Sequence, residues 1–275
     1  MLRHRNLAVL GAGKIGEALI RGLLESELLE RENIIATAKH QKRLDDLAKQ
    51  YGVRTTLDNA LAVEQAELVL LSVKPQTMRE LLEEIAPVVT PRHLLISVAA
   101  SVPTSFIESL VPVEVPVVRA MPNTPCVIRA GMTVLCRGRY ATESHLQLAR
   151  SLFDAVGRTM ILDESHMDAV TGLSASGPAF IYIIIESLAE AGVKVGLARD
   201  VATELAAQTT LGAAKMVLIT NEHPAKLKDA VTTPAGCTID GILELEEGGL
   251  RVTLIKAVVK ATERARCLFP NGERT

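Results

Sequence analysis

The sequence predicts an α/β protein in which a parallel sheet covered by helices precedes an all-helical C-terminal domain. Two observations lead to this fold class. Short apolar runs alternate with helical patterns as far as Leu162, as expected for parallel strands joined by crossover helices. From His166 onward, nearly the whole chain follows a helical pattern. We therefore predict a first domain of residues 1–164 and a second domain of residues 165–275.

Each predicted strand of the first domain is a short, mostly apolar run between loop signals. The predicted strands cover residues 7–10, 34–38, 53–55, 68–72, 94–97, 115–120, 132–136 and 159–162. The helices predicted between them include residues 17–25, 42–51 and 144–155. This alternation of strands and helices is typical of a parallel sheet with helices on its faces.

A glycine-rich turn follows the first predicted strand. Gly11, Gly13 and Gly16 form the pattern G-x-G-x-x-G between this strand and the next helix. The first glycine permits a tight turn, the second lets the backbone approach a pyrophosphate, and the third lets the helix pack close to the strand. The helix N-terminus then presents its N–H groups to the anion. We interpret the segment as the phosphate-binding turn of a Rossmann-like domain, and a chance glycine turn is the alternative.

The end of the second predicted strand favours NADPH over NADH. A domain that binds NAD usually has an Asp or Glu about 20 residues after the glycine turn, where it holds the ribose 2′-hydroxyl. Here no carboxylate occurs before Asp45, and the strand is followed by Lys39, His40, Gln41, Lys42 and Arg43. Such a basic strand end suits a 2′-phosphate. In the alternative interpretation, Lys42 and Arg43 belong to the solvated face of the next helix.

Charge and cysteine usage narrow the class of protein further. With 30 Lys and Arg against 32 Asp and Glu, the net charge is −2, so we expect no nucleic-acid or anionic-membrane partner. The 4 cysteines form no C-x-x-C pair and the 6 histidines have no ligand spacing, so we predict neither a metal site nor disulfides. We expect a reducing, cytoplasmic setting. No uninterrupted apolar run approaches the roughly 18 residues of a membrane span.

The second domain contains a segment that is apolar around most of a helix. Residues 179–185 read Ala-Phe-Ile-Tyr-Ile-Ile-Ile. A helix that is apolar on all sides must be buried on all sides, and a domain of about 110 residues has little interior for it. We expect a symmetric partner chain to cover the segment in an obligate homodimer with interlocked helices. A central helix within one subunit is the alternative.

Three loops of the first domain follow predicted strands at the edge where ligands of an open parallel sheet bind. They cover residues 72–75, 98–101 and 121–125, and prolines stiffen two of them. Their free backbone groups could bind a coenzyme. For Lys74 and Asn123 taken singly, a rigid turn with no binding role explains the sequence equally well.

A further loop, residues 231–238, precedes a predicted helix over residues 239–246. Its hydroxyls, proline and glycine predict a helix N-terminus with exposed N–H donors, which suits a small carboxylate. Thr238 would place its hydroxyl beside such a ligand, and an ordinary helix cap is the alternative. No Ser-His-Asp set or carboxylate pair stands out, but hydride transfer needs neither, because the nicotinamide carries the reactivity.

Together these motifs resemble the pyrroline-5-carboxylate reductase family. The matching segments are residues 11–16, 73–76, 121–125, 168–179, 211–216, 231–238 and 247–251. They span essentially the whole chain. Residues 168–179 and the loop that ends at Thr238 are specific to the family, whereas the glycine pattern is shared by many dinucleotide-binding proteins.

The resemblance implies reduction of the ring C=N bond of 1-pyrroline-5-carboxylate to L-proline with NAD(P)H, the last step of proline biosynthesis. It also implies a Rossmann-like first domain and a second domain that forms an intertwined homodimer, often assembled into a decamer. We expect NADPH as the coenzyme, with NADH as the alternative. From the resemblance and the strand-end loops together, the expected coenzyme-binding residues are Leu10, Gly11, Ala12, Gly13, Lys14, Ile15, Thr37, Ala38, Lys39, Asn59, Ser72, Val73, Lys74, Pro75, Ala99, Ala100 and Asn123.

The resemblance also implies where the substrate binds. The expected substrate-binding residues are Glu164, Thr233, Gly236, Cys237 and Thr238. The backbone N–H groups of Cys237 and Thr238 would bind the substrate carboxylate, and the hydroxyl of Thr238, the expected catalytic group, would meet the ring nitrogen. Glu164 stands where family members have a carboxylate close to the substrate.

The chain departs from the family pattern at a few positions. Relatives often have Ser-Pro-Gly-Gly where this chain has Thr233-Pro234-Ala235-Gly236, so Ala235 is tolerable only if its backbone dihedrals suit a Cβ. Asn221 and Ala230 replace a Glu and an Asn found in some relatives, so contacts carried by these two positions are in doubt.

Two other functions are compatible with parts of the sequence. β-Hydroxyacid dehydrogenases share the two-domain plan and begin the second domain with G-x-x-G-x-G-x-x-x-K. This chain aligns Gly172, Ala175 and Gly177 with those glycines but has Ile181 at the lysine position, which favours imine chemistry. A non-enzymatic NADPH-binding regulator could lose the loop of residues 232–238, which is intact here.

Overall fold

The computed structural model describes residue 2 and residues 4–269, and the chain forms two compact units. Among the described residues, the first unit contains the chain up to Ser176 together with Lys260 to Phe269, and the second is Gly177–Val259. Both limits of the second unit lie at or within helices. The sequence predicted two domains, residues 1–164 and 165–275, from the change to a helical pattern. This division stays a prediction.

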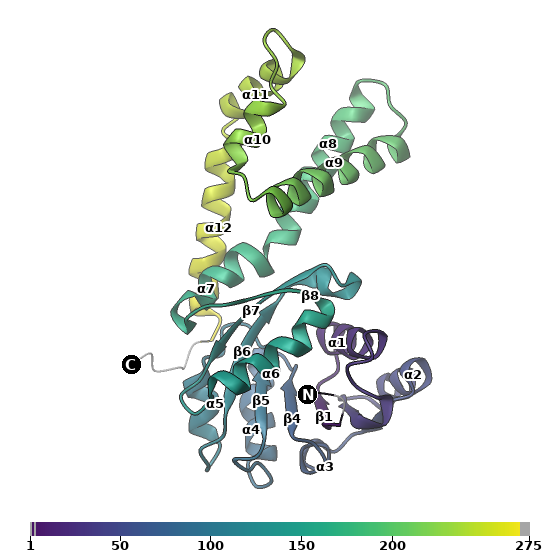
Figure 1. Cartoon of the computed structure of the whole chain (residues 1–275), viewed down its shortest axis with the longest axis vertical. Coiled ribbons are helices and arrows are strands. Elements are labelled where there is room, and N and C mark those ends of the chain that lie inside the picture. The colour runs from purple at the N-terminus through teal and green to yellow at the C-terminus, as the bar shows by residue number, and fades with distance from the viewer. Residues whose placement is uncertain (1, 3, 270–275) are drawn as a thin grey trace. The chain divides into compact units, whose positions relative to one another are not determined.

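An eight-stranded sheet forms the centre of the first unit (Figure 1). Its strands are β1 (Leu7–Leu10), β2 (Ile34–Thr37), β3 (Arg54–Thr56), β4 (Leu68–Leu71), β5 (Leu94–Ser97), β6 (Val117–Pro122), β7 (Gly131–Arg137) and β8 (Gly157–Ile161). Strands β1, β2, β4 and β5 are buried at every position. Their unbroken aliphatic sequences follow from this, because a central parallel strand is covered on both faces.

The strand order is β3-β2-β1-β4-β5-β6-β7-β8, and all neighbouring strands are parallel except β6 and β7. The predicted α/β fold with a parallel-dominated sheet is confirmed, with one antiparallel pair that the sequence analysis did not foresee. The chain leaves β1 toward β2 on one side and returns to β4 on the other. This reversal makes the carboxyl ends of β1 and β4 a topological switch point, where open sheets bind ligands.

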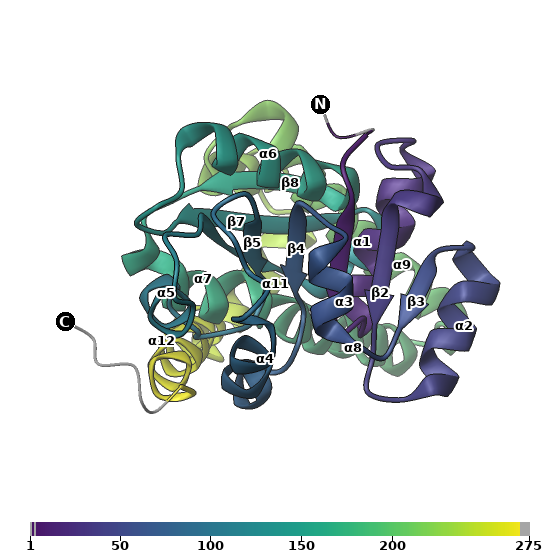
Figure 2. The ribbon, with the colours of Figure 1, turned by 90° about the horizontal axis from the view of Figure 1, so that it is seen from below.

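Helices cover both faces of the sheet (Figure 2). Helices α1 (Lys14–Glu25), α2 (Gln41–Tyr51) and α6 (Glu143–Phe153) contribute to one buried cluster. Helices α3 (Asn59–Glu64), α4 (Met78–Ile85) and α5 (Thr104–Leu110) contribute to the cluster on the opposite face. Short 3-10 turns at Arg31–Asn33, Pro75–Thr77, Thr124–Ile128, Asp154–Val156 and Glu164–His166 complete this part of the chain.

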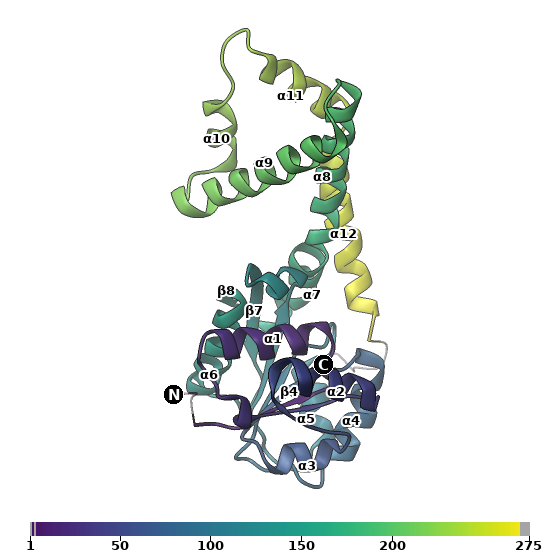
Figure 3. The same ribbon diagram turned by 90° about the vertical axis from the view of Figure 1, so that its right-hand side faces the viewer.

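The rest of the described chain is helical. It comprises α7 (Met167–Val170), a π-helical segment (Thr171–Ala175), α8 (Gly177–Lys194), α9 (Arg199–Thr220), α10 (Pro224–Ala230), α11 (Cys237–Glu247) and α12 (Leu250–Cys267). In the second unit α8 and α9 lie side by side (Figure 3). A Cβ at Gly192 would lie 2.8 Å from the Cβ of Ala202, so this glycine permits close packing within an unbroken helix.

Several helices and strands begin or end at other residues than the sequence predicted. Helix α1 begins at Lys14, inside the glycine turn, and Met121 and Pro122 belong to β6 rather than to the loop after it. Helix α11 begins at Cys237, so Cys237 and Thr238 lie in its first turn. Gly177 is the first residue of α8, and Gly192 lies within the same helix.

One helical stretch among the described residues is long and apolar enough to cross a membrane by length and composition alone. It covers Glu164–Lys194, and its most apolar 18-residue window has a mean hydropathy of 1.4. This stretch contains no long uninterrupted apolar run, because glycines and polar residues such as Thr171, Ser174 and Ser176 lie between its apolar residues. Core helices of soluble proteins pass the same test, so one such stretch is weak evidence for a membrane span.

Candidate active site

The glycine turn between β1 and α1 has the geometry that a phosphate-binding turn requires. Gly11 has a φ of +75°, and a Cβ there would lie 2.6 Å from Cγ1 of Val73. A Cβ at Gly16 would lie 2.9 Å from Cγ1 of Val9. Beside Gly13, by contrast, the nearest atom to such a Cβ is the Gly11 oxygen at 3.9 Å. Two of the glycines thus allow close packing, and Gly13 leaves open space at the N-terminus of α1.

Thr37, at the end of β2, accepts hydrogen bonds that hold this turn against the sheet. The N–H of Gly11 donates to the Thr37 hydroxyl over 3.1 Å, and the N–H of Ala12 donates to the Thr37 carbonyl over 2.7 Å. The hydroxyl itself donates to Oδ1 of Asn59 over 2.6 Å. Nδ2 of Asn59 then donates to Glu84 over 2.9 Å, so the Asn59 amide is fixed from both ends.

A cavity of about 440 Å³ opens beside this turn. Its lining mixes apolar, polar and charged groups, namely Gly11, Thr37, Ala38, Lys39, Leu57, Asn59, Val73, Thr77, Glu80, Leu81 and Glu84. An apolar cavity wall with a few placed polar groups is what a nucleoside needs. Together with the open space at Gly13, the cavity fits the adenosine and pyrophosphate of a dinucleotide.

Arg43 contacts both the glycine turn and Glu17 of α1. Its Nε donates to the Ala12 carbonyl over 3.0 Å, and its Nη2 lies 2.6 Å from the Glu17 carboxylate. Burial raises the pKa of Glu17, but hydrogen bonds from Arg43 and Tyr51 outweigh burial and hold that pKa below its usual value. Neither interpretation of Arg43 from the sequence, as a 2′-phosphate ligand or as a solvated residue, describes these contacts.

The remaining predicted coenzyme residues occupy the ends of β4, β5 and β6. Ser72 to Pro75 follow β4, and Ala99 and Ala100 follow β5. Asn123, after β6, uses its side chain within the first unit. Its Oδ1 accepts from the Met132 N–H over 2.9 Å, and its Nδ2 donates to the Ser174 carbonyl over 3.2 Å. The structure thus gathers these residues on one edge of the sheet and gives the Asn123 side chain a structural role.

The predicted substrate loop lies in the second unit and ends at the first turn of α11. Gly236 is the N-cap residue, and no side-chain hydrogen bond caps the helix among the described residues. The first N–H groups of α11, at Cys237 and Thr238, therefore have no intrahelical acceptor and can bind an anion. A Cβ at Gly236 would meet Oγ1 of Thr233 and lie 3.1 Å from the Thr233 carbonyl oxygen, so a side chain here would force Thr233 to move.

Ala235 adopts a φ of +58°, in the left-handed region that disfavours a Cβ. We expect Ala235→Gly to raise the thermal midpoint of unfolding or leave it unchanged, because relief of about 1 kcal/mol of backbone strain offsets the extra chain entropy. Ala213→Gly, at an exposed site within α9, is the matched control and should cost about 1 kcal/mol. Equal losses of stability in both variants would contradict this account of Ala235.

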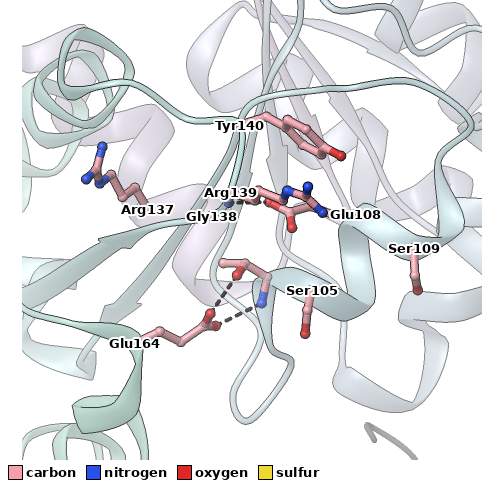
Figure 4. Close-up of a pocket in the computed structure, with 9 residues that line it drawn as sticks. Ser105, Glu108, Ser109, Arg137, Gly138, Arg139, Tyr140 and Glu164 are labelled. Atoms are coloured by element: carbon pink, nitrogen blue, oxygen red, sulfur yellow. Dashed lines mark hydrogen bonds between the residues drawn. The ribbon is translucent and has the colours of Figure 1, made fainter. Parts of the chain in front are cut away.

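Glu164 lies in the first unit, in the 3-10 turn after β8. Its Oε1 accepts from the Thr104 N–H over 2.8 Å and from Nη1 of Arg119 over 3.1 Å. Its Oε2 accepts from the Thr104 hydroxyl over 2.5 Å. In Figure 4 these two bonds are the dashed lines that end at the labelled Glu164. The carboxylate is thus held in one orientation.

A polar cavity of about 720 Å³ has Glu164 in its wall (Figure 4). The other lining residues are Thr104, Ser105, Glu108, Ser109, Arg137, Gly138, Arg139 and Tyr140. Burial is the main cause of a raised pKa at Glu108, and the charge of Glu164 adds to it, while a hydrogen bond from the Arg139 backbone opposes it. Glu164 also lines a second cavity of about 610 Å³, which Cys136 and His166 share.

Sequence reasoning missed Glu84, Thr104 and Arg119, which make direct contacts with predicted site residues. Arg119 carried a usable signal, because an arginine inside the otherwise apolar strand of residues 115–120 must find a partner. Glu84 and Thr104 gave no comparable signal in the sequence. Glutamate on a helix and threonine at a helix start are ordinary, and only the fold brings them to Asn59 and Glu164.

Comparison with known proteins identifies the family. The model described as "Pyrroline-5-carboxylate reductase dimerisation" matches residues 164–268, and the model described as "NADP oxidoreductase coenzyme F420-dependent" matches residues 6–101. The pyrroline-5-carboxylate reductase of Methanosarcina acetivorans is 43% identical over 96% of this chain and 98% of its own. The chain belongs to the pyrroline-5-carboxylate reductase family.

Solved structures of family members have the same fold. The Coxiella burnetii pyrroline-5-carboxylate reductase matches with a TM-score of 0.89 and 36% identity, over 95% of this chain and 97% of its own. The Plasmodium falciparum pyrroline carboxylate reductase, solved with NADP bound, matches with a TM-score of 0.88 and 28% identity, over 98% and 100%. The predicted resemblance and the two-part fold class are thereby confirmed, and the comparisons support a nicotinamide coenzyme.

Proposed function

We propose that the protein reduces the C=N bond of 1-pyrroline-5-carboxylate with NAD(P)H and releases L-proline, the final step of proline biosynthesis. The observation that carries this function is the 43% identity to a pyrroline-5-carboxylate reductase over 96% of the chain. The chain is an NAD(P)H-dependent oxidoreductase of that family. An intact loop from Thr232 to Thr238 supports catalysis over a purely regulatory role.

The coenzyme would lie along the carboxyl edge of the sheet. Leu10 to Ile15 would bind the pyrophosphate, and Thr37, Ala38, Lys39 and Asn59 would surround the adenosine ribose. Ser72 to Pro75, Ala99, Ala100 and Asn123 would line the path toward the nicotinamide. The open space beside Gly13 and the fixed amide of Asn59 support these roles.

The substrate would be bound by the loop before α11. The N–H groups of Cys237 and Thr238 would bind its carboxylate, and Thr233 and Gly236 would shape the loop. Glu164 is the further residue that we propose as a substrate contact. A bound nicotinamide supplies the hydride for such a reduction. The Thr238 hydroxyl would hold the ring nitrogen and so orient the imine.

A spectrophotometric assay tests this function. Adding pyrroline-5-carboxylate to the protein and NADPH should cause the absorbance at 340 nm to fall and L-proline to form in equal amount. The same assay with NADH measures the coenzyme preference. A flat trace with well-folded protein would favour a regulator, and oxidation of 3-hydroxy acids would favour a β-hydroxyacid dehydrogenase instead.

NADPH is the coenzyme that we propose as preferred, on the basis of Lys39 in the adenosine cavity. Lys39→Ala should weaken NADPH about tenfold and leave NADH nearly unchanged, because a charge-assisted bond to the 2′-phosphate is lost. Glu84→Gln should act in the opposite direction and strengthen NADPH about threefold, because it removes a negative charge from the cavity wall.

The ratio of kcat/KM for NADPH to that for NADH is the measurement for both variants. Glu83→Gln is the matched control, because Glu83 neighbours Glu84 but pairs with Arg79 and does not line the cavity. If Lys39→Ala changes both coenzymes alike, the 2′-phosphate is recognised elsewhere.

The helical half carries the match to the family's dimerisation model, so we propose an intertwined homodimer that can assemble further into a decamer. Side chains on α8 support this. Ile181, Tyr182, Ile183 and Leu188 are 42%, 60%, 61% and 49% exposed in the single chain. We propose a cytoplasmic enzyme with a small-molecule substrate and with no nucleic-acid or membrane partner.

A further inference from the structure

The carboxylate of Glu164 uses three of its acceptor positions on two neighbouring elements. Thr104 begins α5 and contributes two donors, and Arg119 in β6 contributes one. A carboxylate has about four acceptor positions. Oε1 receives two bonds and Oε2 receives one, so an acceptor position on Oε2 is unused by the described residues. Because the Glu164 side chain is 29% exposed and lines two cavities, a small molecule can reach it.

Arg119 holds Glu164 at a cost to stability. Its side chain is 4% exposed, and its Nε and Nη2 are buried with no hydrogen-bond partner among the described residues. A buried ion pair often stabilises a fold less than apolar residues of similar size, and unpaired buried N–H groups lower stability further. The neighbours of Arg119 in the strand, Val118 and Ala120, are apolar and fully buried. Stability alone therefore does not account for an arginine at this position.

We infer that Arg119 and Thr104 are positioning residues, which fix the Glu164 carboxylate so that its unused Oε2 position accepts an N–H of the cyclic imino acid. The inference rests on the proposed function, in which Glu164 contacts the substrate. A fixed carboxylate stabilises the protonated imine, the form that accepts hydride at carbon. Hydride addition to the protonated imine gives a neutral amine, and its one N–H can keep the bond to Glu164.

Thr104→Val tests this role, because it keeps the size and the backbone N–H of Thr104 but removes its hydroxyl. The KM for pyrroline-5-carboxylate should rise about tenfold, as for a lost hydrogen bond to a charged group, while the KM for NADPH stays within about twofold. Thr104→Ser retains the hydroxyl and should restore the substrate KM. A general structural defect would raise the KM for NADPH as well as the KM for the substrate, and Thr104→Ser would not restore the substrate KM alone.

A double-mutant cycle with Glu164→Gln separates the possible failures. In the Glu164→Gln background, Thr104→Val should change the substrate KM less than about twofold, because the carboxylate that it orients is gone. If Glu164→Gln alone leaves the substrate KM unchanged, Glu164 does not contact the substrate and the inference fails. If Glu164→Gln raises KM but Thr104→Val does not, Glu164 binds without help from Thr104, and the positioning role is overturned.

Arg119→Lys provides a second variant, in case the valine disturbs the fold. It keeps the positive charge but offers a point donor in place of a planar guanidinium, so it should raise the substrate KM and spare the KM for NADPH. An unchanged substrate KM in Arg119→Lys would overturn the role of Arg119. A wild-type protein that does not turn over pyrroline-5-carboxylate would instead refute the proposed function.

Discussion

Replacing Thr238 by alanine should lower kcat/KM for 1-pyrroline-5-carboxylate about 100-fold, the size of effect seen when one donor at a reacting centre is removed. Thr238 is the second residue of α11, where the backbone N–H and the hydroxyl can both reach a ligand at the helix N-terminus. Alanine keeps the N–H that would bind the carboxylate but loses the group proposed to hold the ring nitrogen. The affinity for NADPH should not change.

Two control variants make this measurement specific. Thr238→Ser keeps a hydroxyl at the same position and should retain most of the activity. Thr232→Ala removes a hydroxyl from the same loop, but that hydroxyl donates to the Lys228 carbonyl over 2.8 Å, so kcat/KM should change little. If Thr238→Ala turns over substrate like the wild type, the catalytic role proposed for its hydroxyl is wrong.

The sheet could be predicted from sequence because a central parallel strand is almost the only structure that buries such short aliphatic runs on both faces. An aliphatic run such as Leu68 to Leu71, with loop signals on both sides, fits a parallel strand that is buried on both faces. In the structure every residue of this run is buried. The last two residues of β6 were not predicted as strand, because Pro122 is unusual in a strand and the 3-10 turn that begins at Thr124 follows closely. The antiparallel direction of β7 depends on the return path of the chain, which composition does not encode.

The site could be predicted where the backbone carries the chemistry. Gly11 and Gly16 restrict this turn, because a positive φ and a close approach at Gly11 and a close approach at Gly16 disfavour a side chain, whereas Gly13 leaves open space. Side-chain partners could not be predicted in this way. Arg43 looked like a phosphate ligand until the fold placed it on the Ala12 carbonyl and on Glu17. The contact between Glu84 and Asn59 joins two helices and exists only through the tertiary packing.

An aspartate in place of Ile183 should weaken the proposed homodimer at least about 100-fold. Ile183 is 61% exposed in the single chain, and Ala189 is the one buried residue of α8 among the described residues. A two-fold interface contains the residue twice, so the loss of two buried isoleucines, about 1.5 kcal/mol or more each, already reaches that factor. Burying two carboxylates at the same place adds a desolvation cost.

Sedimentation at several protein concentrations measures this effect directly. Ile183→Asp should sediment as a monomer where the wild type is dimeric, and its reductase activity should fall in parallel if the assembled form is the active one. Met160→Asp is the control, since Met160 is 49% exposed on β8 in the first unit and is not part of α8. A dimeric Ile183→Asp variant would mean that α8 is covered within its own chain, by movement of the helices around it, and that the partner chain binds elsewhere.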